Sequence, residues 1–106
     1  MNAEDSVEKP VPPWTLLTSH GLVLLFVANH PAATIREIAA DLQLTERRIA
    51  DIIRDLSKAG LLSVQREGRR NRYALNPEAR FRHPIIANLR FSEFVALSRD
   101  PSDGLK

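Results

Sequence analysis

Arginine side chains gather in two short stretches of this sequence. The first stretch follows Thr45 and carries Arg47, Arg48 and Arg54, and the second surrounds Gly68 and carries Arg66, Arg69, Arg70 and Arg72. Guanidinium groups bind phosphate oxygens, and they donate paired hydrogen bonds to the edge of guanine. Glu46 and Asp51 lie within the first stretch, where a carboxylate can accept a hydrogen bond from the amino group of cytosine. These residue types predict contact with a nucleic acid.

The distribution of charge supports this prediction more strongly than the net charge of +2 does. Residues 45–82 carry ten lysines and arginines against five acidic residues, whereas residues 1–44 carry two against five. A basic centre beside an acidic N-terminal part is typical of a nucleic-acid-binding surface. The alternative is that the basic residues only form a solvated face of the protein.

The sequence contains no arrangement that predicts catalysis or a cofactor. Paired carboxylates, a nucleophile with a base, and a glycine-rich phosphate loop are all missing from it. The chain has no cysteine, and His20, His30 and His83 lack the spacing of metal ligands. We therefore expect a protein that is not an enzyme and that holds no metal or cofactor.

The composition predicts a cytoplasmic protein. Its 43% hydrophobic and 26% charged residues are typical of a soluble globular chain. The longest apolar stretch, residues 22–28, is much shorter than the roughly 20 residues that cross a bilayer. The first residues are acidic, unlike the basic start of a signal peptide, so we expect neither a membrane segment nor a leader.

Two helices joined by a short turn are expected to position the first arginine stretch. Thr34 and Glu37 have the spacing of a capping box, which predicts a helix through Asp41. Thr45 can cap a following helix over residues 45–59, whose apolar side chains recur at helical spacing. Gly60 can then adopt the left-handed conformation that ends a helix. Local signals therefore specify both ends of the helix over residues 45–59.

The other segments predict a mainly helical α+β domain with a small β-hairpin. A helix over residues 19–29 is apolar on nearly every face, so it is either buried on all sides or shared with a second subunit. Alternating residues predict a hairpin with strands at 62–65 and 73–76 and a turn at 66–72 that holds the second arginine stretch. A last helix is expected over residues 85–97, with apolar positions at Ile85, Ile86, Leu89, Phe94 and Val95.

These elements divide the chain into four parts. Residues 1–13 hold three prolines and few apolar side chains, so we expect a disordered arm. Trp14, Leu16 and Leu17 are expected to begin a packed domain over residues 14–80. Residues 81–99 would form a linker and a C-terminal helix for dimerisation, and residues 100–106 would be frayed.

The order of helix, short helix, tight turn, capped helix and hairpin is that of a winged helix-turn-helix, with a three-helix core, a wing and here a C-terminal helix. The run from Ile35 through Leu44-Thr45 to Leu62 resembles the helix-turn-helix of ArsR/MarR-type bacterial regulators. Gly68-Arg-Arg-Asn-Arg-Tyr73 and Arg82-His-Pro84 are similar to segments of a group of short bacterial winged-helix proteins. The resemblance covers about residues 13–84.

The resemblance implies a transcriptional regulator that binds double-stranded DNA. The helix over residues 45–59 would enter the major groove, and the wing at 66–72 would lie on the phosphate backbone or in the minor groove. Thr34 and Arg36, near the start of the preceding helix, would bind phosphates. The expected DNA-binding residues are Thr34, Arg36, Thr45, Glu46, Arg47, Arg48, Asp51, Arg54, Arg66, Arg69, Arg70 and Arg72.

Two positions depart from the family's pattern. Gln43 stands in the turn where related proteins often have glycine, and a left-handed non-glycine residue costs about 1 kcal/mol. Ala50 stands where related recognition helices often present a polar side chain. Sequence-specific reading of DNA is therefore predicted less strongly than DNA affinity.

The apolar helix over residues 19–29 and the apolar positions of the helix over residues 85–97 favour a homodimer. The two copies would join through both segments and address DNA half-sites about one helical turn apart. An alternative is a winged-helix module that docks a protein partner without sequence-specific DNA binding. The acidic residues of the helix over residues 45–59 favour this alternative, and the four arginines of the wing at 66–72 oppose it. A small-molecule effector is compatible with the regulator, but the sequence names none.

Overall fold

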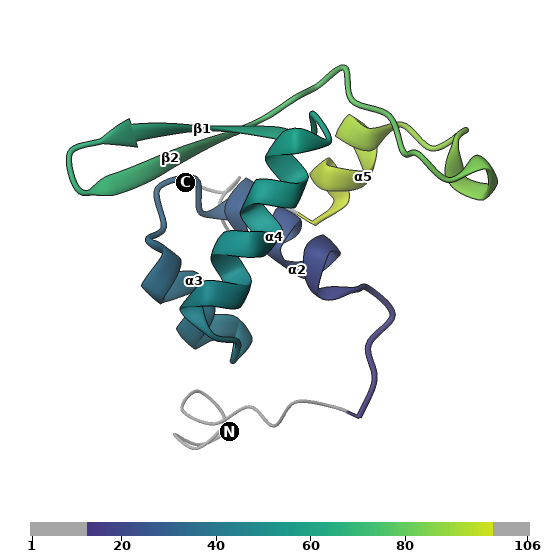
Figure 1. Cartoon of the computed structure of the whole chain (residues 1–106). Coiled ribbons are helices and arrows are strands. Elements are labelled where there is room, and N and C mark those ends of the chain that lie inside the picture. The colour runs from purple at the N-terminus through teal and green to yellow at the C-terminus, as the bar shows by residue number, and fades with distance from the viewer. Residues whose placement is uncertain (1–12, 99–106) are drawn as a thin grey trace, which may run out of the picture.

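The computed structural model describes residues 13–98, and Figure 1 shows how their elements are arranged. The expected arm at 1–13 and the expected tail at 100–106 lie outside these residues, apart from Pro13. The elements in chain order are α2 (Ser19–Asn29), α3 (Ile35–Leu42), α4 (Glu46–Lys58), β1 (Leu62–Glu67), β2 (Arg70–Leu75), the 3₁₀ helix η1 (Pro84–Ile86) and α5 (Phe91–Leu97). The helices form a bundle from which a two-stranded antiparallel hairpin extends, and this confirms the predicted α+β fold class.

The predicted caps position α3 and α4. The Thr34 side chain accepts a hydrogen bond from the Glu37 amide while the Glu37 carboxylate accepts one from the Thr34 amide, so the capping box is complete. Gln43 ends α3 in the left-handed conformation, with φ at 58°, as the missing glycine led us to expect. After α4, Gly60 is left-handed with φ at 80°, and the Leu61 amide donates to the Leu56 carbonyl oxygen. This bond completes the predicted Schellman motif.

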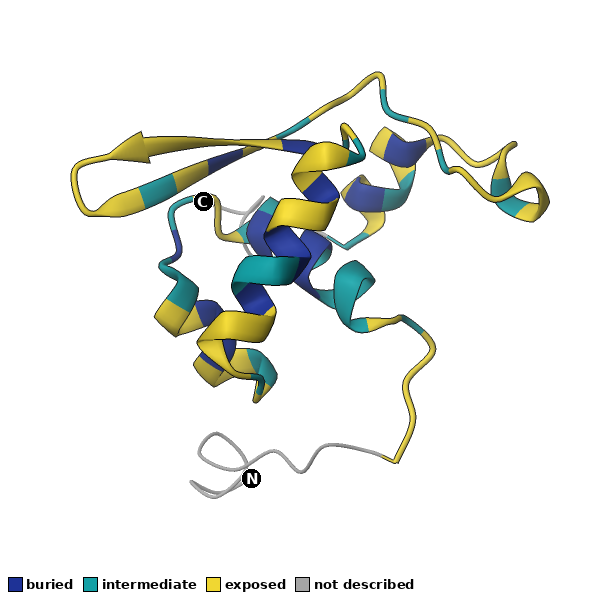
Figure 2. Ribbon diagram, viewed as in Figure 1, coloured by how far each residue is buried: buried dark blue, intermediate teal, exposed yellow. Residues whose placement is uncertain are grey.

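The core lies where α4 packs against α2 and α3. α4 buries an aliphatic stripe, and α2 buries three residues against it, so most of the apolar surface of α2 is used within its own chain. Figure 2 shows these buried residues gathered inside the bundle, with exposed residues along α4 and over most of the hairpin. The buried side chains are Ile49, Ile52, Ile53 and Leu56 on α4 and Val23, Leu24 and Val27 on α2.

The hairpin is longer and its turn tighter than the sequence predicted. The turn contains only Gly68 and Arg69, because Gly68 adopts a positive φ of 63° that a two-residue hairpin turn requires. Three of the four wing arginines therefore lie on the strands and not in a turn. Tyr73 faces the core and is buried, whereas Val64 opposite it is exposed, so the hairpin buries apolar side chains only at its root.

The predicted helix over residues 85–97 is wrong in its first half. Residues 84–86 form a single 3₁₀ turn, the chain then folds back to form an isolated bridge between Arg80 and Arg90, and α5 begins only at Phe91. Phe91 and Val95 are the buried pair, and the Phe91 ring meets Phe81 edge-on at a centroid distance of 5.7 Å. Burying this pair requires the fold-back, which leaves Ile85 81% exposed.

The expected start of the packed domain is also wrong. Trp14 is 76% exposed and Leu16 is 90% exposed, because the core is completed by α2, which begins after them at Ser19. Leu17 is half-buried beside Gly21. Within residues 13–98, no helix is long and apolar enough to span a membrane.

Candidate nucleic-acid interface

The outer face of α4 carries a charged stripe opposite its buried one. Arg47, Asp51, Arg54 and Lys58 recur every three to four residues, which places them on one side of the helix. All but the half-buried Asp51 are exposed. Arg47 at the start of this stripe has no hydrogen-bond or ion-pair partner within residues 13–98, so its guanidinium is available to a ligand.

The N-terminus of α4 is open to solvent. Thr45 caps it, with its side-chain oxygen accepting a hydrogen bond from the Arg48 amide at 3.0 Å. Thr45, Glu46, Arg47 and Arg48 are all exposed. The positive end of the helix dipole therefore points away from the core together with two guanidinium groups, and such an end attracts anions.

Several charges of α4 are paired within the protein. The Arg54 guanidinium lies 3.0 Å from the Asp51 carboxylate, one helical turn away. The His20 ring of α2 lies 2.8 Å from the Asp55 carboxylate. The hydrogen bond from His20 holds the pKa of Asp55 below its ordinary value, and Arg48 and Arg54 add smaller Coulombic effects. Asp51 therefore neutralises part of the charge that Arg54 would offer to DNA.

The four wing arginines differ in what they contact. Arg69 at the turn and Arg72 on β2 are exposed, and the part of the chain that the structure describes offers neither a partner. The Arg66 guanidinium donates to the Gly68 carbonyl oxygen at 3.0 Å, across the turn. Arg70 instead contacts the helical bundle. The free cations of the wing are thus at its tip and on β2.

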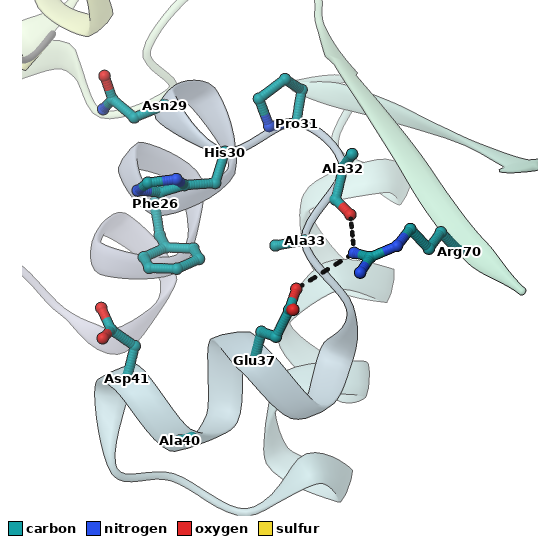
Figure 3. Close-up of a pocket in the computed structure, with 10 residues that line it drawn as sticks. All are labelled: Phe26, Asn29, His30, Pro31, Ala32, Ala33, Glu37, Ala40, Asp41 and Arg70. Carbon is teal, nitrogen blue, oxygen red and sulfur yellow. Dashed lines mark hydrogen bonds and ion pairs between the residues drawn. The ribbon is translucent and has the colours of Figure 1, made fainter.

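Arg70 reaches away from the wing into the segment that joins α2 to α3 (Figure 3). Its guanidinium donates to the Ala32 carbonyl oxygen at 2.7 Å and lies 3.3 Å from the Glu37 carboxylate. The Thr34 amide donates to the same carboxylate oxygen, at 2.8 Å. The Thr34 amide first, and then Arg70, hold the pKa of Glu37 below its ordinary value. These contacts form one wall of an open groove of about 790 Å³ between α2, α3 and the wing.

The two expected phosphate clamps lie near the start of α3. The Thr34 oxygen is occupied as an acceptor by the capping box, and its hydroxyl hydrogen can still be donated. Arg36 is exposed and has no partner within the described chain. The start of α3 therefore offers the exposed Arg36 guanidinium and the half-buried Thr34 hydroxyl as hydrogen-bond donors.

A comparison with protein families decides the nature of this arrangement. A family model described as a winged helix DNA-binding domain matches residues 16–79, which is more than half of the chain. This chain belongs to the winged helix DNA-binding family. A search of curated proteins gives no match. Domains of this winged-helix type are typically not enzymes, and residues 13–98 contain no group of histidine and acidic side chains that could hold a metal ion.

The sequence analysis missed the contacts that three polar residues make beside the candidate interface. Glu37 was identified only as a cap, Asp55 was not singled out among the acidic residues of the helix over residues 45–59, and His20 was considered only as a metal ligand. Their partners are 33 to 35 residues away in the chain, so no local spacing predicts these contacts. One available signal was that Asp55 is an acidic residue among the basic side chains that follow Thr45.

Proposed function

We propose that this winged-helix protein is a transcriptional regulator related to the ArsR/MarR type and that it binds double-stranded DNA in the cytoplasm. The N-terminal half of α4 enters the major groove, with Arg47 and Arg48 donating to guanine. Glu46 and Asp51 accept from cytosine, while Thr45 and Arg54 complete the helix surface. Arg66, Arg69 and Arg72 follow the phosphates or enter the minor groove, and Thr34 and Arg36 bind phosphate beside α3.

One observation carries this proposal more than any other. Arg47 on α4 and Arg69 and Arg72 on the wing are exposed and have no partner within residues 13–98. They belong to two elements of a winged helix DNA-binding domain. An unpaired cation is free to replace the counterions of a phosphate, whereas a paired one must first leave its partner.

Fluorescence anisotropy with a random-sequence DNA duplex tests the proposal. We expect the folded protein to bind at low salt, and the logarithm of the affinity to fall linearly with the logarithm of the salt concentration. No binding at low salt by a folded protein would contradict DNA binding.

We further propose that the protein acts as a homodimer. The sequence favoured a dimer because α2 is apolar all round, but α2 buries much of that surface in its own core. The stronger support is the apolar surface that the bundle leaves uncovered near α5, where Leu89 is 50% exposed and Leu97 is exposed. Together with Phe94 these residues line a mostly apolar groove. Sedimentation at tens of micromolar should give a dimer, and a monomer there would remove this part of the proposal.

The same apolar surface favours the second candidate function, a module that docks a different protein. Asp51 and Asp55 on α4 would then be docking charges, and the wing arginines would have no DNA to bind. A folded monomer that fails to bind DNA at low salt is the result that would favour this function over the regulator.

A further inference from the structure

The wing and the α2–α3 segment are joined at two adjacent points. The Tyr73 amide of β2 donates to the Pro31 carbonyl oxygen at 2.8 Å. Three residues nearer the tip of the wing, the Arg70 guanidinium donates to the carbonyl oxygen of the next residue, Ala32, at 2.7 Å. Because two separated attachments define a direction, these bonds fix both the position of β2 against the α2–α3 segment and the direction in which the hairpin extends.

The second attachment is also tied to the helix-turn-helix. One oxygen of the Glu37 carboxylate accepts from the Thr34 amide and lies 3.3 Å from the Arg70 guanidinium. The carboxylate therefore caps α3 and holds β2 at the same time. A phosphate placed against the Arg70 guanidinium would approach this negative carboxylate and be repelled by it.

From this geometry we propose that Arg70 is a positioning residue, which orients the wing relative to α3 and α4 and does not itself bind phosphate. This inference rests on the proposed DNA-binding function. It separates the wing arginines by role. Arg69 and Arg72 are free to contact DNA, and Arg70 keeps them at the distance from α4 that one duplex requires.

The test compares two neighbouring substitutions by anisotropy on the same random-sequence duplex over a salt series. Arg69→Ala should reduce the magnitude of the salt slope by about 0.9, the value for one phosphate that the protein no longer neutralises. Arg70→Ala should weaken binding about fivefold to tenfold, the value of a typical intramolecular hydrogen bond, and leave the slope at its wild-type value. Arg70→Lys should recover part of the affinity, because an ammonium can still donate to Ala32 or Glu37.

Amide hydrogen exchange provides a second readout without DNA. Arg70→Ala should speed the exchange of the Tyr73 amide, since the wing is then held at one point only, and Arg69→Ala should leave this rate unchanged. If Arg70 contributed only to stability, Arg70→Ala would lower the midpoint of thermal unfolding and leave the affinity of the folded protein for DNA unchanged.

Three results would overturn the inference. The first is a salt slope that falls for Arg70→Ala as much as for Arg69→Ala, which would make Arg70 a phosphate contact. The second is wild-type affinity in Arg70→Ala, and the third is an unchanged exchange rate at Tyr73. If the wild-type protein itself does not bind the duplex at low salt, it is the proposed function that fails, and the exchange experiment still tests the attachment.

Discussion

Helix α4 and the wing, the two parts of the proposed interface, are built in opposite ways. α4 buries four aliphatic side chains, is capped by Thr45, and ends in a Schellman motif at Gly60. Two of its charged side chains, Asp51 and Arg54, pair with each other. The wing buries only Leu62 and Tyr73 at its root, and its tip extends beyond the bundle (Figure 2). The bonds of Tyr73 and Arg70 attach it to the α2–α3 segment.

This difference predicts separate roles for α4 and the wing. A helix fixed by its core and both caps can present Arg47 to the edges of bases at constant geometry, which sequence reading requires. A hairpin with few buried residues and free arginines supplies charge, for which an approximate position is enough. We therefore expect substitutions in α4 to alter stability and base preference, and substitutions in the wing to alter salt dependence.

The largest effect should come from the core beneath α4. Ile52 is fully buried, so Ile52→Ala should lower the free energy of unfolding by about 3 kcal/mol, through reduced burial and the cavity left behind. Urea unfolding followed by circular dichroism measures this change. Val64→Ala in the exposed part of the wing is the matched control and should change stability by less than about 0.5 kcal/mol. Equal losses of stability in the two variants would contradict the contrast.

The next effect concerns base contacts. Arg47→Ala should weaken binding to a selected operator by about 1–3 kcal/mol and relax the preference at one base pair, while binding to random DNA changes much less. Arg69→Ala should weaken binding to both duplexes by a similar factor. Binding to the selected operator and to random DNA, measured side by side, distinguishes the two variants. A uniform weakening in Arg47→Ala would mean that α4 contacts only the backbone.

A smaller effect is expected at the start of α4. Thr45→Ala removes the acceptor of the Arg48 amide and should cost about 1 kcal/mol of stability, as other N-cap substitutions do. Ser57→Ala, at an exposed position inside the same helix, is the control and should be neutral or slightly stabilising. Chemical unfolding of both variants provides the measurement, and an unchanged stability in Thr45→Ala would show that the cap is unimportant.

The smallest effect is a dependence on pH. The pKa of Asp55 is lower in the folded protein than in the unfolded chain, so its pairing with His20 stabilises the fold above the unfolded pKa. This stability is lost as the pH falls through the folded pKa. Asp55→Asn should therefore be less stable than wild type near neutral pH, and the difference should shrink in acid. Urea unfolding at both pH values measures it. A difference that grows in acid would contradict the pairing.

The sequence predicted α4 and its neighbours because their signals are local. Thr34 with Glu37, Thr45, and Gly60 each specify a helix end within a few residues, so α3 and α4 were located to within one residue at each end. The left-handed Gln43 followed from the same reasoning. The core stripe of α4 followed from its helical period.

The errors fell where contacts distant in the chain decide the structure. A stripe with Ile85 and Leu89 predicted one helix, but the contact of Phe91 with Phe81 and the bridge between Arg80 and Arg90 make the chain fold back first. The inward turn of Arg70 depends likewise on Ala32 and Glu37, more than 30 residues earlier. No spacing within either segment carries that information.

The most direct test of the account is a map of amide signals by NMR as a DNA duplex is added to the folded protein. We predict that the largest shifts fall in residues 45–54, which comprise the cap and the first part of α4, and around Gly68 and Arg69 in the wing, with α5 little affected. Shifts confined to α5 and residues 84–90, or no shifts at low salt, would contradict a shared interface of α4 and the wing.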